Sequence, residues 1–222
     1  MRHIPNLLTC FNLLCGCLGI VFVLENRNIE AAYFVWAACV FDFFDGFAAR
    51  TLKVSSPIGK ELDSLADVIS FGLLPAVVMY KLWPADSGEY LPFVSFSIAI
   101  FSALRLAIFN VDETQRDSFR GLPTPANALL ITAFPLQGGV VMDWLTLPWV
   151  LVAVIILSSF LLVSPLELFA LKFKNFTWQA NKIRFTFLIL SVLVLAFGQA
   201  PAIPLVIILY IGLSLGVQIL SK

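Results

Sequence analysis

Four aspartates, Asp42, Asp45, Asp63 and Asp67, lie close together in a chain that is 60% hydrophobic and contains only 14 acidic residues. A carboxylate at membrane depth costs roughly 2.5 kcal/mol or more on the insertion scale, so such residues are rarely retained without a use. Four of them at helical spacing suggest a cation site.

The spacing predicts that two helices present these carboxylates to one shared point. Asp42 and Asp45 are three residues apart, and Asp63 and Asp67 are four apart, so each pair lies on one helix face. The linker at residues 51–58 contains a Ser-Ser-Pro run, which should break the helix and return the chain into the membrane. We therefore expect a helical hairpin with two carboxylates on each arm.

Carboxylates held this close would repel one another unless cations neutralised them. Hard oxygen ligands suit Mg²⁺ or Mn²⁺, which keep coordination positions open for water and substrate phosphates. Two such cations per site can hold a diphosphate and stabilise charge on a leaving phosphate. Arg50 and Lys60, at the mouth of the hairpin, would add phosphate contacts.

Two other interpretations fit the aspartate spacing. The acids could pair with Arg50, Lys53 and Lys60 as a salt-bridge network at the helix ends. They could also bind Na⁺ or H⁺ in an ion-coupled transporter. The transporter is disfavoured because the acids cluster in one hairpin and no symmetric second half is visible in the sequence.

Composition points to a membrane protein. The chain has 222 residues and a mean hydropathy of +0.95. Only 13% of its residues are charged, too few to supply the polar shell of a soluble domain. Its net charge of zero gives a nucleic-acid partner no electrostatic support. The four cysteines lie in apolar stretches and are expected to serve packing. The first apolar segment is interpreted as a retained span rather than a cleaved signal peptide.

The predicted fold is an all-α polytopic membrane helix bundle, formed as one integral-membrane domain over residues 1–222. Its hydrophobic segments, each long enough to approach the roughly 20 residues of a span, number eight: 5–24, 31–50, 61–82, 91–110, 125–142, 147–163, 184–198 and 203–220.

Lys and Arg placement predicts the orientation of these spans. With eight spans both termini share one side, and the opposite side keeps only Arg27 and Lys81. The shared side would hold Arg2, Arg50, Lys53, Lys60, Arg105, Arg116, Arg120, Lys172, Lys174, Lys182, Arg184 and Lys222. This bias places the termini and the loop of the acid hairpin in the cytoplasm.

The run D-x-x-D-G-x-x-A-R-x8-G-x-x-x-D-x-x-x-D resembles the signature of the CDP-alcohol phosphotransferases. All of its fixed positions are present: Asp42, Asp45, Gly46, Ala49, Arg50, Gly59, Asp63 and Asp67. The resemblance implies transfer of a phosphate-linked group from a CDP-linked donor to an alcohol, with release of CMP. It also implies that the last acid, Asp67, is the general base.

Further segments resemble one branch of that family, the bacterial integral-membrane phosphatidylserine synthases. They are I-P-N-L-L-T-C-F-N-L-L-C-G (4–16), R-L-A-I-F-N (105–110), F-R-G-L-P-T-P-A-N-A (119–128) and K-F-K-N-F (172–176). This branch implies CDP-diacylglycerol as donor and L-serine as acceptor, in the bacterial inner (cytoplasmic) membrane and as a homodimer. One departure is Ile108, where many relatives carry a basic residue.

The resemblance also suggests a role for each remaining site residue. The metal ligands would be Asp42, Asp45, Asp63 and Asp67, and the residues around the CDP diphosphate would be Asn6, Thr9, Gly46, Ala49, Arg50, Gly59 and Lys60. Arg105 and Arg120 would bind the serine carboxylate, with Asn110 orienting them. Glycerol-3-phosphate, giving phosphatidylglycerol phosphate, is the alternative acceptor within the family, and the signature also leaves other alcohols open.

Overall fold

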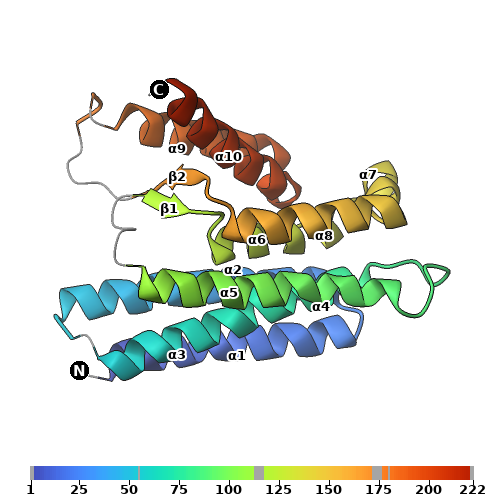
Figure 1. Ribbon diagram of the computed structural model, residues 1–222, viewed down its shortest axis with the longest axis horizontal. Helices are drawn as coiled ribbons and strands as arrows, with labels where there is room; N and C mark the ends of the chain where they lie inside the picture. Colours follow the sequence, from blue (N-terminus) through green and yellow to red (C-terminus); the bar gives the residue numbers. More distant parts are fainter. Residues whose placement is uncertain (1–2, 55, 113–117, 172–176, 180, 221–222) are drawn as a thin grey trace.

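The computed structural model of the chain describes residues 3–54, 56–112, 118–171, 177–179 and 181–220. Within that part the chain is almost entirely helical (Figure 1). The α-helices are α1 (Ile4–Leu24), α2 (Asn28–Thr51), α3 (Pro57–Asp67), α4 (Leu74–Lys81), α5 (Ser97–Val111), α6 (Thr124–Thr132), α7 (Gly139–Leu145), α8 (Pro148–Val163), α9 (Lys182–Gly198) and α10 (Ile203–Leu220). The shorter elements are η1 (Val68–Leu73), η2 (Leu91–Phe96), η3 (Phe134–Leu136), η4 (Ala200–Ala202), β1 (Ser118–Arg120) and β2 (Glu167–Phe169).

Five helices among the described residues are long and apolar enough to cross a membrane. They are Ile4–Leu24, Asn28–Thr51, Pro57–Lys81, Leu91–Val111 and Ala200–Ile219. A sixth span is formed if α7 and α8, which meet at a bend of 73°, are counted together. The prediction of an all-α membrane protein is therefore confirmed, and these segments match the expected spans at 5–24, 31–50, 61–82, 91–110, 147–163 and 203–220.

Two expected spans differ in the structure. The segment predicted at 125–142 is divided into α6, η3 and α7, because Gln137 and Gly138 adopt extended backbone and Gly139 has a φ of +51°. The segment predicted at 184–198 forms α9, an apolar helix of 17 residues that is slightly shorter than a typical span. Eight continuous spans are thus more than the described helices support by length and composition.

A short ribbon was not expected from the sequence. Strand β1 pairs antiparallel with β2, with Arg120 opposite Glu167. Just after β1, Gly121 has a φ of +75° and its N–H donates to the carbonyl of Leu166. A side chain at Gly121 would collide with the carbonyl oxygen of Leu162, so only glycine fits where the ribbon meets the end of α8.

Helices α1 to α5 pack together in one half of the molecule, α9 and α10 lie in the other, and α6 and α8 lie between them (Figure 1). Small residues allow the closest approach in the first half. A Cβ on Gly16 would lie 2.5 Å from Ser70 Oγ and 2.9 Å from its Cα, and one on Gly19 would lie 2.5 Å from Leu74. Helix α1 therefore contacts the backbone of η1 directly.

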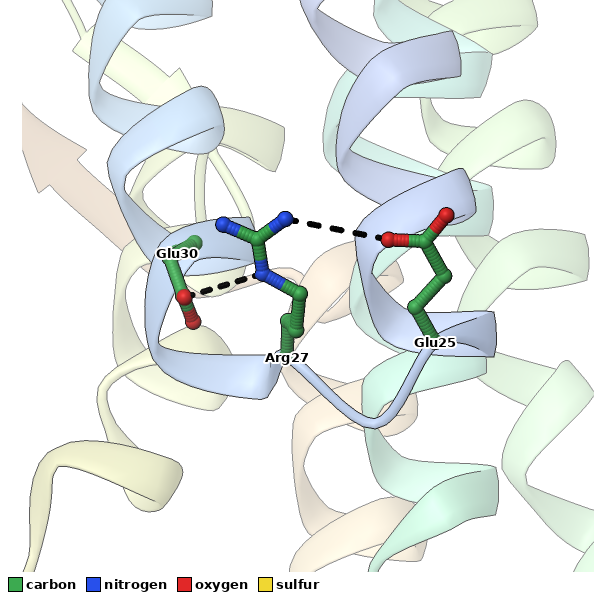
Figure 2. A network of polar contacts seen from close by, with 3 residues as sticks. All are labelled: Glu25, Arg27 and Glu30. Atoms are coloured by element: carbon green, nitrogen blue, oxygen red, sulfur yellow. Dashed lines mark hydrogen bonds and ion pairs between the residues drawn. The ribbon is translucent and has the colours of Figure 1, made fainter.

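The turn between α1 and α2 carries a small polar network at its exposed surface (Figure 2). Arg27 Nε donates to Glu30 Oε1 at 3.0 Å, and Arg27 Nη1 lies 3.8 Å from Glu25 Oε2. The guanidinium also lies over the ring of Phe22 at 4.1 Å. Exposed ion pairs contribute about 0–1 kcal/mol, so this network mainly fixes the geometry of the turn.

Several residues used in the sequence interpretation fall outside the described part. They are Arg2, Arg116, Lys172, Lys174 and Lys222, together with the rest of the K-F-K-N-F segment at 172–176.

Candidate active site

Three of the four aspartates meet at one point. Asp42 on α2 and Asp63 and Asp67 on α3 each offer a carboxylate oxygen, and these oxygens all lie within 4.8 Å of one another. Ser56 caps α3 by accepting a hydrogen bond from the N–H of Gly59 at 3.0 Å, which fixes where the helix begins. This start directs the later aspartates toward α2, as the spacing predicted.

Asp45 lies beside this triad rather than within it. It is buried, and its Oδ2 accepts a hydrogen bond from Thr9 Oγ1 at 2.7 Å. Thr9 Oγ1 is also 3.1 Å from the carbonyl oxygen of Pro5, one turn earlier in α1. Asp45 is therefore held by α1 and faces the cavity described below.

Asn12 is a site residue that the sequence interpretation missed. It is fully buried on α1, and its Nδ2 donates to Asp67 Oδ1 at 3.0 Å. The backbone carbonyl oxygen of Asn12 accepts a hydrogen bond from Ser70 Oγ at 2.9 Å. Ser70 lies in the π-helical segment η1, which begins directly after Asp67. Wide π turns inside helices often occur at functional sites. The available signal was the position of Asn12 three residues after Thr9, on the same helix face.

The triad fits a divalent cation. Its donor set is made only of carboxylate oxygens, which are the ligands that Mg²⁺ and Mn²⁺ prefer. Among the described residues, Asp63 Oδ1 is buried and has no hydrogen-bond partner. An unpaired buried carboxylate oxygen is costly, and a bound cation would remove that cost.

A cavity of about 610 Å³ opens next to the acids, between α1, α2 and α3. Its lining residues are His3, Pro5, Asn6, Thr9, Asp45, Gly46, Ala49, Lys53, Val54, Ser56, Ile58, Gly59, Lys60 and Asp63. The structure therefore brings together six of the seven residues expected around the diphosphate. His3 and Lys53 also line this cavity and add basic groups that the sequence interpretation did not place around the diphosphate.

The seventh residue, Arg50, contributes in a different way. It does not line this cavity among the described residues, but its guanidinium covers Gly46, where a Cβ would lie 3.3 Å from Arg50 Nη1. A Cβ on Gly59 would lie 3.1 Å from Asn6 Oδ1 and from Ser56 Oγ. Both glycines thus border polar groups that a side chain would displace.

Lys60 and Asn110 connect α3 to α5. Lys60 Nζ donates to the carbonyl oxygen of Asn110 at 2.7 Å, and Asn110 Nδ2 donates to Ser64 Oγ at 2.7 Å. The side-chain amide nitrogen of Asn110 is therefore directed to α3. The role expected for Asn110, orienting Arg105 and Arg120, stays a prediction.

Arg105 and Arg120 do lie together, at a second cavity of about 250 Å³. The other residues at this cavity are Ile108, Phe109, Asp112, Leu162, Val163, Ser164 and Pro165. Arg105 is only 7% exposed. The side chain of Arg120 is 57% exposed and lies 4.0 Å from Asp112. The two arginines thus differ sharply in their access to water.

A family model described as CDP-alcohol phosphatidyltransferase matches residues 2–137. The chain is 36% identical over 129 residues to the CDP-diacylglycerol–serine O-phosphatidyltransferase of Bacillus subtilis strain 168, covering 56% of this chain and 71% of that protein. It is 37% identical over 129 residues to the protein of the same name from Helicobacter pylori strain 26695, covering 57% and 54%. It is 36% identical over 138 residues to the archaetidylserine synthase of Methanothermobacter thermautotrophicus, covering 61% and 58%.

The chain therefore belongs to the CDP-alcohol phosphatidyltransferase family. The resemblance drawn from the aspartate motif is confirmed. The chain spans about half the length of the Helicobacter and Methanothermobacter relatives, and more of the Bacillus one.

Proposed function

We propose that this protein is a phosphatidylserine synthase, which transfers the phosphatidyl group of CDP-diacylglycerol to the hydroxyl of L-serine and releases CMP. The observation that carries the proposal is the position of the aspartate cluster, whose Asp63 lines the 610 Å³ cavity together with six of the residues expected around the diphosphate. Family membership and the names of the relatives support the donor and the acceptor.

The CDP head of the donor would occupy the larger cavity. Asn6, Thr9 and Lys60 would contact its polar groups, while Gly46, Ala49 and Gly59 leave room for it. Arg50, beside Gly46, would approach the phosphates from the mouth. The acyl chains would enter sideways from the bilayer, since α2 carries exposed apolar side chains such as Phe43, Phe44 and Phe47.

Asp42, Asp63 and Asp67 would hold Mg²⁺ or Mn²⁺, with two cations per site and Asp45 as a further ligand. Bound there, the cations would neutralise the diphosphate and stabilise the charge on departing CMP. This assignment is supported by the close approach of the three carboxylates and by the unpartnered Asp63 Oδ1.

Asp67 would act as the general base. The serine hydroxyl oxygen attacks the phosphorus attached to diacylglycerol, its proton passes to Asp67, and the bond from that phosphorus to the oxygen of CMP breaks. Asn12 fixes the carboxylate by donating to Oδ1, which leaves Oδ2 to accept the proton. The serine carboxylate would lie toward Arg105 and Arg120 in the smaller cavity.

The protein would lie in the bacterial inner membrane with its active site facing the cytoplasm, as a homodimer. The distribution of Lys and Arg along the chain supports this orientation. Helix α1 begins and α10 ends toward the same end of the molecule, where α3 also begins (Figure 1), which supports both termini on the cytoplasmic side. A total of eight spans would require α6 and α9 to cross the bilayer as short helices.

CMP release by the purified protein tests this proposal. We expect release from CDP-diacylglycerol only when both serine and Mg²⁺ or Mn²⁺ are present. Glycerol-3-phosphate and inositol serve as competing acceptors in parallel reactions. Release with glycerol-3-phosphate alone would change the product, and a folded protein that releases no CMP with any acceptor would contradict the proposed activity.

A further inference from the structure

The first turn of α6 carries buried polar side chains that have no role in the proposed mechanism. Thr124 is 1% exposed and Asn127 is 0% exposed. Among the described residues, Thr124 Oγ1 and both side-chain polar atoms of Asn127 have no hydrogen-bond partner. Leaving such groups buried and unpaired costs about 1–3 kcal/mol each. The two residues are three apart on one helix face, so one ligand can satisfy both.

Backbone contacts bring this turn beside the second cavity. Just before α6, the N–H of Leu122 donates to the carbonyl oxygen of Leu161 at 2.8 Å. Leu161 precedes the segment at 162–165 that lines the cavity. Thr124 follows Leu122 by two residues, a reach of at most about 7 Å. Helix α6 also packs against α5, which supplies Arg105.

The electrostatics of this region favour an anion. The N-terminus of α6 has no side-chain cap, and the N-terminal end of a helix carries a partial positive charge. Arg105 is nine-tenths buried, and its Nε has no hydrogen-bond partner among the described residues. The acid that borders the cavity, Asp112, pairs with Arg120 at 4.0 Å. These donors therefore lie on α5 and α6, two helices that contact each other beside the second cavity.

We propose that Thr124, Asn127 and Arg105 bind the carboxylate of an α-amino-acid acceptor. Thr124 Oγ1 and Asn127 Nδ2 donate to the carboxylate oxygens, and the Arg105 guanidinium pairs with their charge. Asn127 Oδ1 accepts from the α-ammonium of the same molecule, so both orphan atoms of the amide are satisfied. This site deepens the proposed function and rests on it. In this site α6 recognises the amino acid, whereas the exposed Arg120 lies at the mouth of the cavity.

Variants of Asn127 and Thr124 test the site through the KM for serine. Asn127→Ala and Thr124→Val should raise that KM by roughly tenfold or more, as expected for a lost hydrogen bond to a charged group. The KM for CDP-diacylglycerol should stay at the wild-type value. Asn127→Asp should raise the KM for serine more than Asn127→Ala does, because the introduced aspartate repels the carboxylate of serine. Thr124→Ser, which keeps the hydroxyl, should restore a near-normal KM.

Thr132→Val is the matched control on the same helix. Thr132 is also fully buried, but its Oγ1 already donates to the carbonyl oxygen of Ala128 at 2.7 Å. Its replacement should leave the KM for serine unchanged. An equal increase in Thr132→Val and Asn127→Ala would mean that both act through packing of α6, and this result would overturn the site.

Direct binding separates failure of the site from failure of the proposed function. Labelled serine is measured on wild-type protein with CDP-diacylglycerol present, in competition with L-serine methyl ester and serinol, which lack a carboxylate. Competition by these compounds at least tenfold weaker than by serine is the expected result. The site alone is overturned if the protein turns over serine while serine, its methyl ester and serinol compete equally well. It is also overturned if the Asn127 and Thr124 variants are folded and keep the wild-type KM for serine. No serine binding and no serine-dependent CMP release overturns both proposals.

Discussion

Asn12 and Asp67, on helices that are far apart in the sequence, are joined by a hydrogen bond of 3.0 Å between two buried side chains. Asn12 is in turn fixed by the contact of its backbone carbonyl with Ser70 in η1. Helix α1 therefore positions the carboxylate that the proposed mechanism uses as the base, although α1 contributes no aspartate of its own.

Replacing Asn12 should lower the rate of turnover more than it weakens substrate binding. In Asn12→Ala, Asp67 loses the donor that holds Oδ1, and a hydrogen bond to a charged group is worth about 1.5–3 kcal/mol. We expect kcat to fall by roughly ten- to a hundredfold with the KM values for both substrates nearly unchanged. CMP-release kinetics measure this. Cys10→Ala, an exposed change on the same helix, is the control, and a wild-type kcat in Asn12→Ala would deny Asn12 a positioning role.

Asp67→Asn should abolish turnover and spare donor binding. The amide keeps the shape of the carboxylate but cannot accept the serine proton, so the chemical step loses its base. Single-turnover CMP release and equilibrium binding of CDP-diacylglycerol distinguish the two effects. Turnover at the wild-type rate would remove Asp67 from the mechanism, whereas loss of donor binding would indicate that its main role is to hold a cation.

Gly46→Leu should prevent nucleotide binding. Its Cβ would already lie 3.3 Å from Arg50 Nη1, and the rest of the leucine would enter the 610 Å³ cavity. CDP affinity, measured by isothermal titration, should fall below detection. Gly212→Leu is a suitable control, because a Cβ there meets nothing within 4 Å. Unchanged CDP affinity in Gly46→Leu would place the nucleotide elsewhere.

The aspartates and the small residues around them could be predicted from the sequence because their contacts are local. Asp42, Asp63 and Asp67 lie on the two arms of one hairpin, so helical spacing determines which face each occupies. Asn12 could not be found in this way, since its partner is 55 residues away. Only the close approach of α1 to η1 at Gly16 reveals that pairing.

The second half of the chain was predicted less well for a related reason. The segment at 125–142 is apolar enough to predict one continuous helix, yet the backbone of Gln137 and Gly138 is extended and interrupts it. The pairing of β1 with β2 joins residues 47 to 51 positions apart, as in Arg120 with Glu167 and Ser118 with Phe169. Asn110 Nδ2 donates to Ser64 Oγ on a helix earlier in the chain. Each of these features depends on contacts between distant segments, which periodicity along one segment does not encode.

Removal of metal should stop the reaction, and the aspartates should differ in how they respond to it. Asp42, Asp63 and Asp67 converge within 4.8 Å, whereas Asp45 is bound to Thr9 beside them. EDTA should abolish CMP release, and added Mn²⁺ or Mg²⁺ should restore it.

Asp42→Asn and Asp63→Asn should remain inactive at any metal concentration, because each removes a ligand from the triad. Asp45→Asn should keep part of the activity but require roughly tenfold more metal, since it loses about 1.4 kcal/mol of affinity if it contributes one outer contact. Titration of activity against Mn²⁺ in each variant measures the difference. Identical behaviour of all three variants would make Asp45 an equal member of the metal site.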